Sequence, residues 1–173
     1  MDQVALPPSE WVMHWMSCLP TGGRILDVAC GSGRHTRMLA QAGYRVEAVD
    51  RDLSSLGEIA GFPGVAARQL DLEASPWPYG AAAFDGIVVT NYLHRPLFPH
   101  LLASLSPGGV LIYETFAQGN EAFGKPSNPV FLLKPGELLE WVHGCLRVLA
   151  YEDIFVSRPK AAMIQRICAV RPN

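Results

Sequence analysis

A glycine-containing turn between an apolar run and a helical run places the strongest limit on how this chain folds. The largely apolar run, residues 25–28, has the length of a buried strand. Gly31 and Gly33 follow it and allow backbone conformations that other residues resist. A helical run then covers residues 34–42. Such a unit presents unpaired backbone amides at the helix N-terminus, where polar groups of a ligand bind. The stretch therefore predicts a cofactor-binding α/β unit.

The residues around this turn separate two classes of cofactor. A dinucleotide-binding turn follows the pattern G-x-G-x-x-G, and Thr36 occupies the position of the last glycine. Asp27 precedes the turn and would bring a carboxylate close to a pyrophosphate. A carboxylate suits a cation instead, and the methionine part of S-adenosylmethionine carries an ammonium group beside a sulfonium. The turn therefore favours S-adenosylmethionine over a nicotinamide dinucleotide.

Residues 27–33, with the sequence DVACGSG, closely resemble motif I of the class I S-adenosylmethionine-dependent methyltransferases. Ala29 stands where many members of that family have a first glycine. The resemblance implies that Asp27, Ala29, Gly31 and Gly33 bind the methionine part of the cofactor. Within the class, the chain is most similar to the small tellurite-resistance-type and ubiquinone-biosynthesis-type methyltransferases.

An acidic residue follows the second predicted strand, which covers residues 45–49. Asp50 lies 17 residues beyond Gly33, near the spacing at which a βαβ unit places a carboxylate on the ribose hydroxyls. Two carboxylate oxygens can accept hydrogen bonds from two adjacent hydroxyls. We therefore predict that Asp50 binds the ribose and that Arg51, beside it, belongs to the same cofactor site.

A second acidic residue follows the third predicted strand, residues 65–70. In the resembling family an acidic residue at this place hydrogen-bonds the adenine amino group. The resemblance thus implies that Asp71 binds adenine and that Leu72 supplies an apolar contact to the ring. A solvated acidic loop is the alternative for Asp71.

The fourth predicted strand, residues 84–91, resembles motif IV of the family, whose carboxyl end faces the transferred methyl group. Open α/β sheets bind ligands at the carboxyl ends of their strands, so Asn91 is assigned to the cofactor. His94 is the first candidate for a catalytic base, because histidine titrates near neutral pH, and Tyr92 is a second candidate catalytic residue. A histidine that caps or packs the next helix is the alternative for His94.

Residues after the Pro107-Gly108-Gly109 turn and the fifth predicted strand are the candidates for an acceptor pocket. They are Tyr113, Glu114 and Phe116, although aromatic rings at strand ends also fill cores and Glu114 could be a surface residue. Residues 116–134 form the longest stretch without a helical or strand pattern. Loops of this length in compact domains are usually functional, so we predict an acceptor-side loop.

These elements predict the fold class. We expect an α/β fold with a single-domain, Rossmann-like, doubly wound and mostly parallel seven-stranded sheet, with one antiparallel strand near the C-terminus. The domain covers residues 1–173, and residues 1–23 form an N-terminal helix and lead-in. Residues 74–83 show little helical pattern, so the helix before the fourth strand is short or absent. Strands at 146–156 and 161–170 form a closing hairpin that a plain dinucleotide fold lacks.

The composition of the chain limits which classes of partner and which cellular location we expect. Apolar residues make up 49% of the 173 residues and the net charge is −2, which gives no general attraction to nucleic acid or membranes. We therefore expect a small-molecule acceptor rather than protein or RNA, with no DNA and no membrane partner. The start of the chain lacks a signal-peptide pattern, which favours a cytoplasmic location. The four cysteines lack metal-ligand spacing, so we predict reduced, mostly buried thiols and no metal.

The predicted function is a methyltransferase that moves a methyl group from S-adenosyl-L-methionine to an acceptor by in-line displacement, leaving S-adenosyl-L-homocysteine. The cofactor carries the difficult chemistry, so no fixed catalytic residue is required. Two alternatives stay open: a nicotinamide-dependent oxidoreductase, and a non-catalytic cofactor-binding or scaffold protein.

Overall fold

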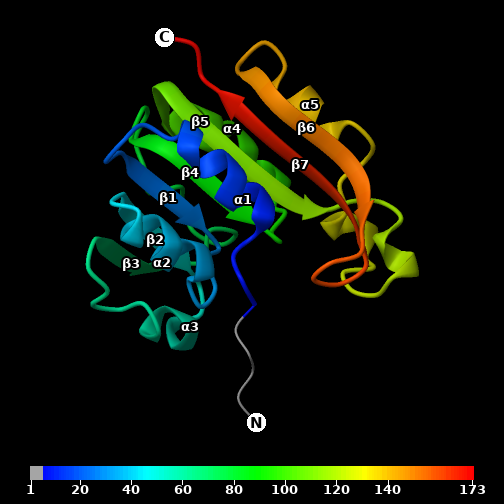
Figure 1. The fold of residues 1–173 in the computed structure, drawn as a ribbon, viewed down its shortest axis with the longest axis horizontal. Helices are drawn as coiled ribbons and strands as arrows, with labels where there is room; N and C mark the ends of the chain where they lie inside the picture. The colour runs from blue at the N-terminus through cyan, green and yellow to red at the C-terminus, as the bar shows by residue number, and fades with distance from the viewer. Residues whose placement is uncertain (1–5) are drawn as a thin grey trace.

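A seven-stranded sheet forms the centre of the molecule in the computed structural model, which describes residues 6–173 (Figure 1). The strand order is β3-β2-β1-β4-β5-β7-β6. β7 runs antiparallel to both β5 and β6, whereas all paired strands among β1 to β5 are parallel. The predicted fold class is therefore confirmed. The strand bounds are β1 Arg24–Val28, β2 Arg45–Asp50, β3 Val65–Gln69, β4 Phe84–Thr90, β5 Leu105–Phe116, β6 Arg147–Val156 and β7 Ala162–Val170.

Helices cover both faces of this sheet. The α-helices are α1 Glu10–Trp15, α2 Arg34–Gln41, α3 Leu53–Gly57, α4 Phe98–Ser104 and α5 Glu137–Val142. Alternation along β4 separates the two faces, because Val88 packs with α1 and α2 whereas Ile87 and Val89 pack with α4 and α5. Both faces are apolar, which explains the nearly continuous apolar runs of the inner strands.

Short 3-10 turns adjoin two of the α-helices. The run at residues 10–19 divides into α1 and a 3-10 turn at Met16–Cys18, and residues 95–105 divide into a 3-10 turn at Arg95–Leu97 and α4. α5 begins at Glu137, directly after Gly136, whose positive φ of 75° is not helical. The predicted turn at Pro107 lies within β5, whose register against β4 shifts there.

An aromatic segment replaces the helix before β4, as the sequence predicts. Trp77 Nε1 donates to Ser104 Oγ at 2.9 Å, and its ring stacks on His100 of α4. The Tyr79 hydroxyl donates to Glu47 Oε1 at 3.1 Å. Residues 70–83 therefore cover the sheet beside α4 without a helix of their own.

The segment before α1 is tied to the start of α2 and to β5. Arg34 Nη1 donates to the Pro7 carbonyl at 2.8 Å, and the Ser9 amide donates to His35 Nε2 at 2.9 Å. The Ser9 hydroxyl donates to Glu114 Oε1 at 2.8 Å. Burial lowers the pKa of His35 to about 3, so its ring stays neutral and Nε2 stays an acceptor.

Candidate cofactor and acceptor site

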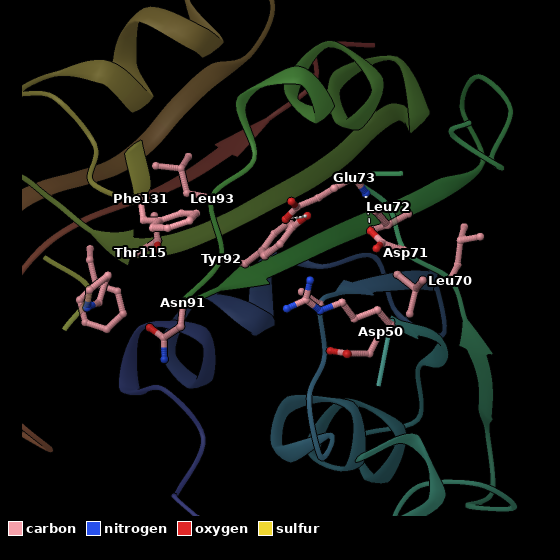
Figure 2. Close-up of a pocket in the computed structure, with 15 residues that line it drawn as sticks. Asp50, Leu70, Asp71, Leu72, Glu73, Asn91, Tyr92, Leu93, Thr115 and Phe131 are labelled. Carbon is pink, nitrogen blue, oxygen red and sulfur yellow. Dashed lines mark hydrogen bonds between the residues drawn. The ribbon is translucent and has the colours of Figure 1, made fainter. Parts of the chain in front are cut away.

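A cavity of about 420 Å³ opens at the carboxyl ends of the parallel strands (Figure 2). This position and volume are typical of small-molecule sites in open α/β sheets. Asp50 and Asp71 lie at one end of the cavity, and Thr115 and Phe131 lie at the other. The lining residues are Ala29, Val49, Asp50, Arg51, Leu70, Asp71, Leu72, Glu73, Asn91, Tyr92, Leu93, Thr115, Phe116, Pro126 and Phe131.

The glycine turn needs left-handed backbone at three positions. Gly31 and Gly33 have φ values of 55° and 79°, and Ala29 has a φ of 51°. A residue with a Cβ costs roughly 1–2 kcal/mol in this region, so Ala29 introduces strain where a glycine would not. The Gly31 amide donates to Asp50 Oδ2 at 2.8 Å, and the Asp52 amide donates to Asp50 Oδ1 at 2.9 Å. Asp50 therefore fixes the turn against the end of β2 and lines the cavity with the same carboxylate.

Asp27 is buried beneath the turn and does not line the cavity. Its Oδ2 accepts a hydrogen bond from Thr36 Oγ1 at 2.6 Å. Burial raises the pKa of Asp27 to about 7, although the Thr36 hydrogen bond and the nearby Arg34 charge act in the opposite direction. Sequence reasoning used Thr36 only to exclude a dinucleotide, whereas the structure makes it the partner of Asp27.

We expect the stability of the wild type to fall, relative to Asp27→Asn, as pH rises from about 4 to about 7. The folded protein binds a proton at Asp27 over this interval, whereas the unfolded chain has already released it, because burial raises the pKa. The asparagine can still accept from Thr36 and does not titrate. Urea unfolding across this pH range measures the difference, and coincident pH profiles of the two proteins would show that Asp27 has an ordinary pKa.

Asp71 and Leu72 form the wall after β3. Asp71 Oδ1 accepts from the backbone amides of Glu73 and Ala74 at 2.9 and 3.3 Å, which fixes the turn and the direction of the carboxylate. Leu72 is buried and belongs to the core beneath the cavity. Both residues line the end of the cavity that contains Asp50. Their contacts with adenine stay predictions.

Glu73 and Tyr92 connect two walls of the cavity, a contact that sequence reasoning missed. The Tyr92 hydroxyl donates to Glu73 Oε1 at 3.2 Å, and burial together with the Glu73 charge raises the pKa of Tyr92 well above its usual range. Tyr92 is thus a hydrogen-bond donor at neutral pH. His94 does not line the cavity, and its Nδ1 lies 3.9 Å from Glu73 Oε2. The catalytic roles of Tyr92 and His94 stay predictions.

The three residues predicted for an acceptor pocket lie in different surroundings. Phe116 lines the cavity, whereas Tyr113 and Glu114 do not. Tyr113 is buried and its hydroxyl donates to the Tyr92 carbonyl at 2.7 Å, and burial raises its pKa far above the usual range. Glu114 Oε2 lies 3.2 Å from Arg166 Nη1. The structure therefore brings only Phe116 of this set to the cavity.

The predicted acceptor-side loop is ordered by contacts with distant segments. Its ends meet where Ala117 pairs with Leu133, and short 3-10 turns lie at Asn120–Ala122 and Pro129–Phe131. Pro126 and Phe131 of this loop line the cavity. The loop thus forms one wall of the site, and the sequence signal that locates it is its length after β5.

Within residues 6–173, no three histidine, cysteine or acidic side chains gather as metal ligands. In the same range, no helix is both long and apolar enough to span a bilayer. All four cysteines are free, but Cys18 and Cys145 are exposed, so the expectation of mostly buried thiols is wrong for half of them.

Residues 25–109 match the protein family described as a methyltransferase domain. A protein-L-isoaspartate O-methyltransferase from Chlorobaculum tepidum is 37% identical over 102 residues, which are 52% of this chain and 43% of that protein. A tRNA U34 carboxymethyltransferase from Methylococcus capsulatus is 32% identical over 142 residues, which are 70% of this chain and 43% of that protein. The chain thus spans less than half the length of these curated relatives.

Solved structures share the fold over nearly the whole chain. An S-adenosylmethionine-dependent methyltransferase from Mesorhizobium loti superposes with a TM-score of 0.72 at 19% identity, covering 92% of this chain and 96% of that one. TehB from Haemophilus influenzae gives a TM-score of 0.75 at 18% identity, covering 99% of this chain and 64% of that one. The sequence match over residues 25–109, the sheet topology and the position of the cavity agree with a methyltransferase domain that has the fold of these solved S-adenosylmethionine-dependent methyltransferases.

Proposed function

We propose that this protein transfers a methyl group from S-adenosylmethionine to an uncharged, planar or apolar acceptor group. The observation that carries the proposal is the cavity, which runs from Asp50 and Asp71 past Asn91 to an apolar end at Phe131. When bound, the cofactor supplies a carbon already activated by the sulfonium. The work left to the protein is to hold donor and acceptor in line, which supplies about 7–11 kcal/mol of the barrier in well-oriented reactions.

The donor half of the proposal assigns a polar contact to each end of the cofactor's nucleoside. Asp50 would accept hydrogen bonds from the ribose hydroxyls, and Asp71 would accept one from the adenine amino group. Both carboxylates are already held by backbone amides, so little reorganisation is needed when the cofactor binds. Leu72, at the same end of the cavity, would contact the adenine ring.

The acceptor half of the proposal follows from the chemistry of the other end. Its lining side chains are uncharged, and they are Leu93, Thr115, Phe116, Pro126 and Phe131. An ionic group would lose its hydration there without a partner, whereas an aromatic or apolar group would not. The small molecule expected from composition fits this description, and so does a single base or side chain of a larger acceptor. A cytoplasmic location also stays part of the proposal.

We expect Asp50→Ala to weaken binding of S-adenosylhomocysteine by about tenfold or more, since it removes two acceptors for the ribose and one anchor of the glycine turn. Asp52→Ala is the matched control: Asp52 is an exposed carboxylate in the same loop that caps α3 and does not line the cavity. Calorimetric titration measures both affinities, and thermal unfolding verifies that each variant is folded.

Three outcomes would contradict the proposal. Equal affinities of the two variants would remove Asp50 from the ribose site. Saturable binding of NADH with no response to S-adenosylhomocysteine would favour an oxidoreductase. Cofactor binding without transfer of labelled methyl groups to any extract component would favour a non-catalytic protein.

A further inference from the structure

All three lysines of the chain lie in the acceptor-side loop or beside it. Lys125 and Lys134 belong to the acceptor-side loop, and Lys160 belongs to the turn between β6 and β7. Arg158 lies in the same turn. In residues 116–134 and 156–162 the one acidic residue is Glu121, whereas acidic residues exceed basic ones in the rest of the chain. The negative net charge therefore conceals a local positive region.

The loop and the turn, drawn in yellow-green and orange in Figure 1, lie side by side. The Ala117 amide donates to the Met163 carbonyl at 2.9 Å, and Asn120 Oδ1 accepts from the Met163 amide at 3.2 Å. The Lys160 ammonium lies beside the backbone of Gly124, 3.3 Å from where a Cβ at that glycine would be. These contacts bring Lys160 close to Lys125 although the two lie far apart in the chain.

Exposed aromatic rings accompany the lysines on this surface. The rings of Phe123 and Phe155 lie 5.1 Å apart, and they are 40% and 50% exposed. Phe131 is 48% exposed and also lines the cavity. We call Phe123, Phe131, Phe155, Lys125 and Lys160 the basic–aromatic face. Clustered exposed rings on a small domain indicate an interaction site, and Phe131 makes this one continuous with the acceptor end of the cavity.

The cations of this region are free to bind an external anion. Among residues 6–173, no carboxylate lies within 4 Å of the charged groups of Lys125, Lys134, Arg158 or Lys160. Proteins that bind single-stranded nucleic acid combine such cations, which contact phosphates, with aromatic rings, on which bases stack. An acidic peptide would use the cations but would leave the rings without a matching partner.

We propose that the basic–aromatic face binds a single-stranded segment of RNA and presents one of its bases to the cavity. Unpaired loops are the part of a folded RNA whose bases can be turned outward and stacked on aromatic side chains. A base is planar and uncharged, as the acceptor end requires. This inference rests on the proposed function and names its acceptor class, in place of the small molecule expected from composition.

The direct test is fluorescence anisotropy of a labelled single-stranded RNA of about 15 nucleotides, titrated with the full chain in the presence of S-adenosylhomocysteine. We expect saturable binding that weakens as salt rises, because phosphate contacts release counterions. The double variant Lys125→Glu/Lys160→Glu should lower the affinity by roughly tenfold or more and flatten the salt dependence.

Two variants distinguish RNA binding at the basic–aromatic face from a general attraction of RNA to positive charge. Arg45→Glu reverses an exposed charge at the start of β2, which is the opposite end of that strand from Asp50, and should leave RNA affinity within about twofold. Phe155→Ala keeps every charge and removes one exposed ring, and should weaken binding by about fivefold or more. Both substitutions leave the cavity lining unchanged.

Several results would overturn the inference. One is the absence of saturable RNA binding by a protein that still binds S-adenosylhomocysteine, which would leave the proposed function intact. Equal weakening by Arg45→Glu and by the lysine double variant would also overturn it. So would binding of polyglutamate as tight as that of RNA, which would favour an acidic protein partner. RNA binding without any binding of S-adenosylhomocysteine would instead reject the proposed function.

Discussion

Gly33→Ala should lower the free energy of unfolding by about 2–4 kcal/mol. Two independent effects combine at this position. The backbone φ of 79° is unfavourable for a residue with a Cβ, and an added Cβ would lie 2.4 Å from Ile59 Cγ2. Ile59 is fully buried with Leu56 and Cys30, so it has little room to move. Urea unfolding of the purified variant measures the loss.

Gly31→Ala is the control within the same turn. Its φ of 55° is also left-handed, but no atom lies within 4 Å of the added Cβ. We expect this variant to lose only about 1–2 kcal/mol, which is the backbone cost alone. Equal losses of unfolding free energy in the two variants would show that the contact with Ile59 contributes nothing, because the backbone around residue 33 shifts to relieve it.

Arg95→Ala should be the most damaging substitution in the acceptor-side wall, with an expected loss of about 2–4 kcal/mol. Arg95 Nε and Nη2 lie 2.6 and 3.0 Å from the carboxylate of Glu137, which is buried. The same guanidinium donates to the carbonyls of Val130 and Leu132 in the loop. Without it, a buried carboxylate loses its counter-charge and two loop carbonyls lose a donor. Because Arg95 is partly exposed, the expected loss of stability is smaller than the largest losses seen when a fully buried ion pair is broken.

The double variant Arg95→Ala/Glu137→Gln tests this explanation. Although burial acts to raise the pKa of Glu137, hydrogen bonds from Arg95 and from the Lys134 amide hold it below its usual range. The carboxylate therefore stays ionised at neutral pH, and replacing it by an amide should recover part of the stability lost in Arg95→Ala. A double variant less stable than Arg95→Ala would contradict the unpaired-charge explanation. Limited proteolysis at Val130 reports the accompanying loosening of the loop.

Local patterns in the sequence predicted the sheet and the polar end of the cavity. Asp50 is the last residue of β2 and Asp71 comes two residues after the end of β3, so the position of each strand end also fixes the position of the carboxylate. The cofactor contacts themselves stay predictions. Asp27 shows the limit of this reasoning, because a carboxylate one residue before the end of β1 can point into the core, and only the packing of Thr36 against it reveals this.

Most of the residues at the acceptor end of the cavity could not be predicted from local sequence patterns, because contacts between distant parts of the chain place them there. β5 extends to Phe116, so Tyr113 and Glu114 lie within the strand and point to opposite faces, one into the core and one toward α1. Pro126 and Phe131 reach the cavity through the loop, whose shape depends on residues as distant as Arg95. Composition also obscured the basic–aromatic face, since an average over the whole chain hides a local charge.

The position of β7 also determines when this protein can fold during synthesis. β7 is the last strand in chain order, yet it lies between β5 and β6 and hydrogen-bonds to both. Trp11 Nε1 of α1 donates to the Ile167 carbonyl, a contact spanning 156 residues. Until residue 170 has left the ribosome, two long strand edges stay open and α1 lacks part of its docking surface. A nascent chain that stalls before β7 is therefore expected to expose aggregation-prone edges, because β7 is the pairing partner of both β5 and β6 and supplies part of the surface on which α1 docks.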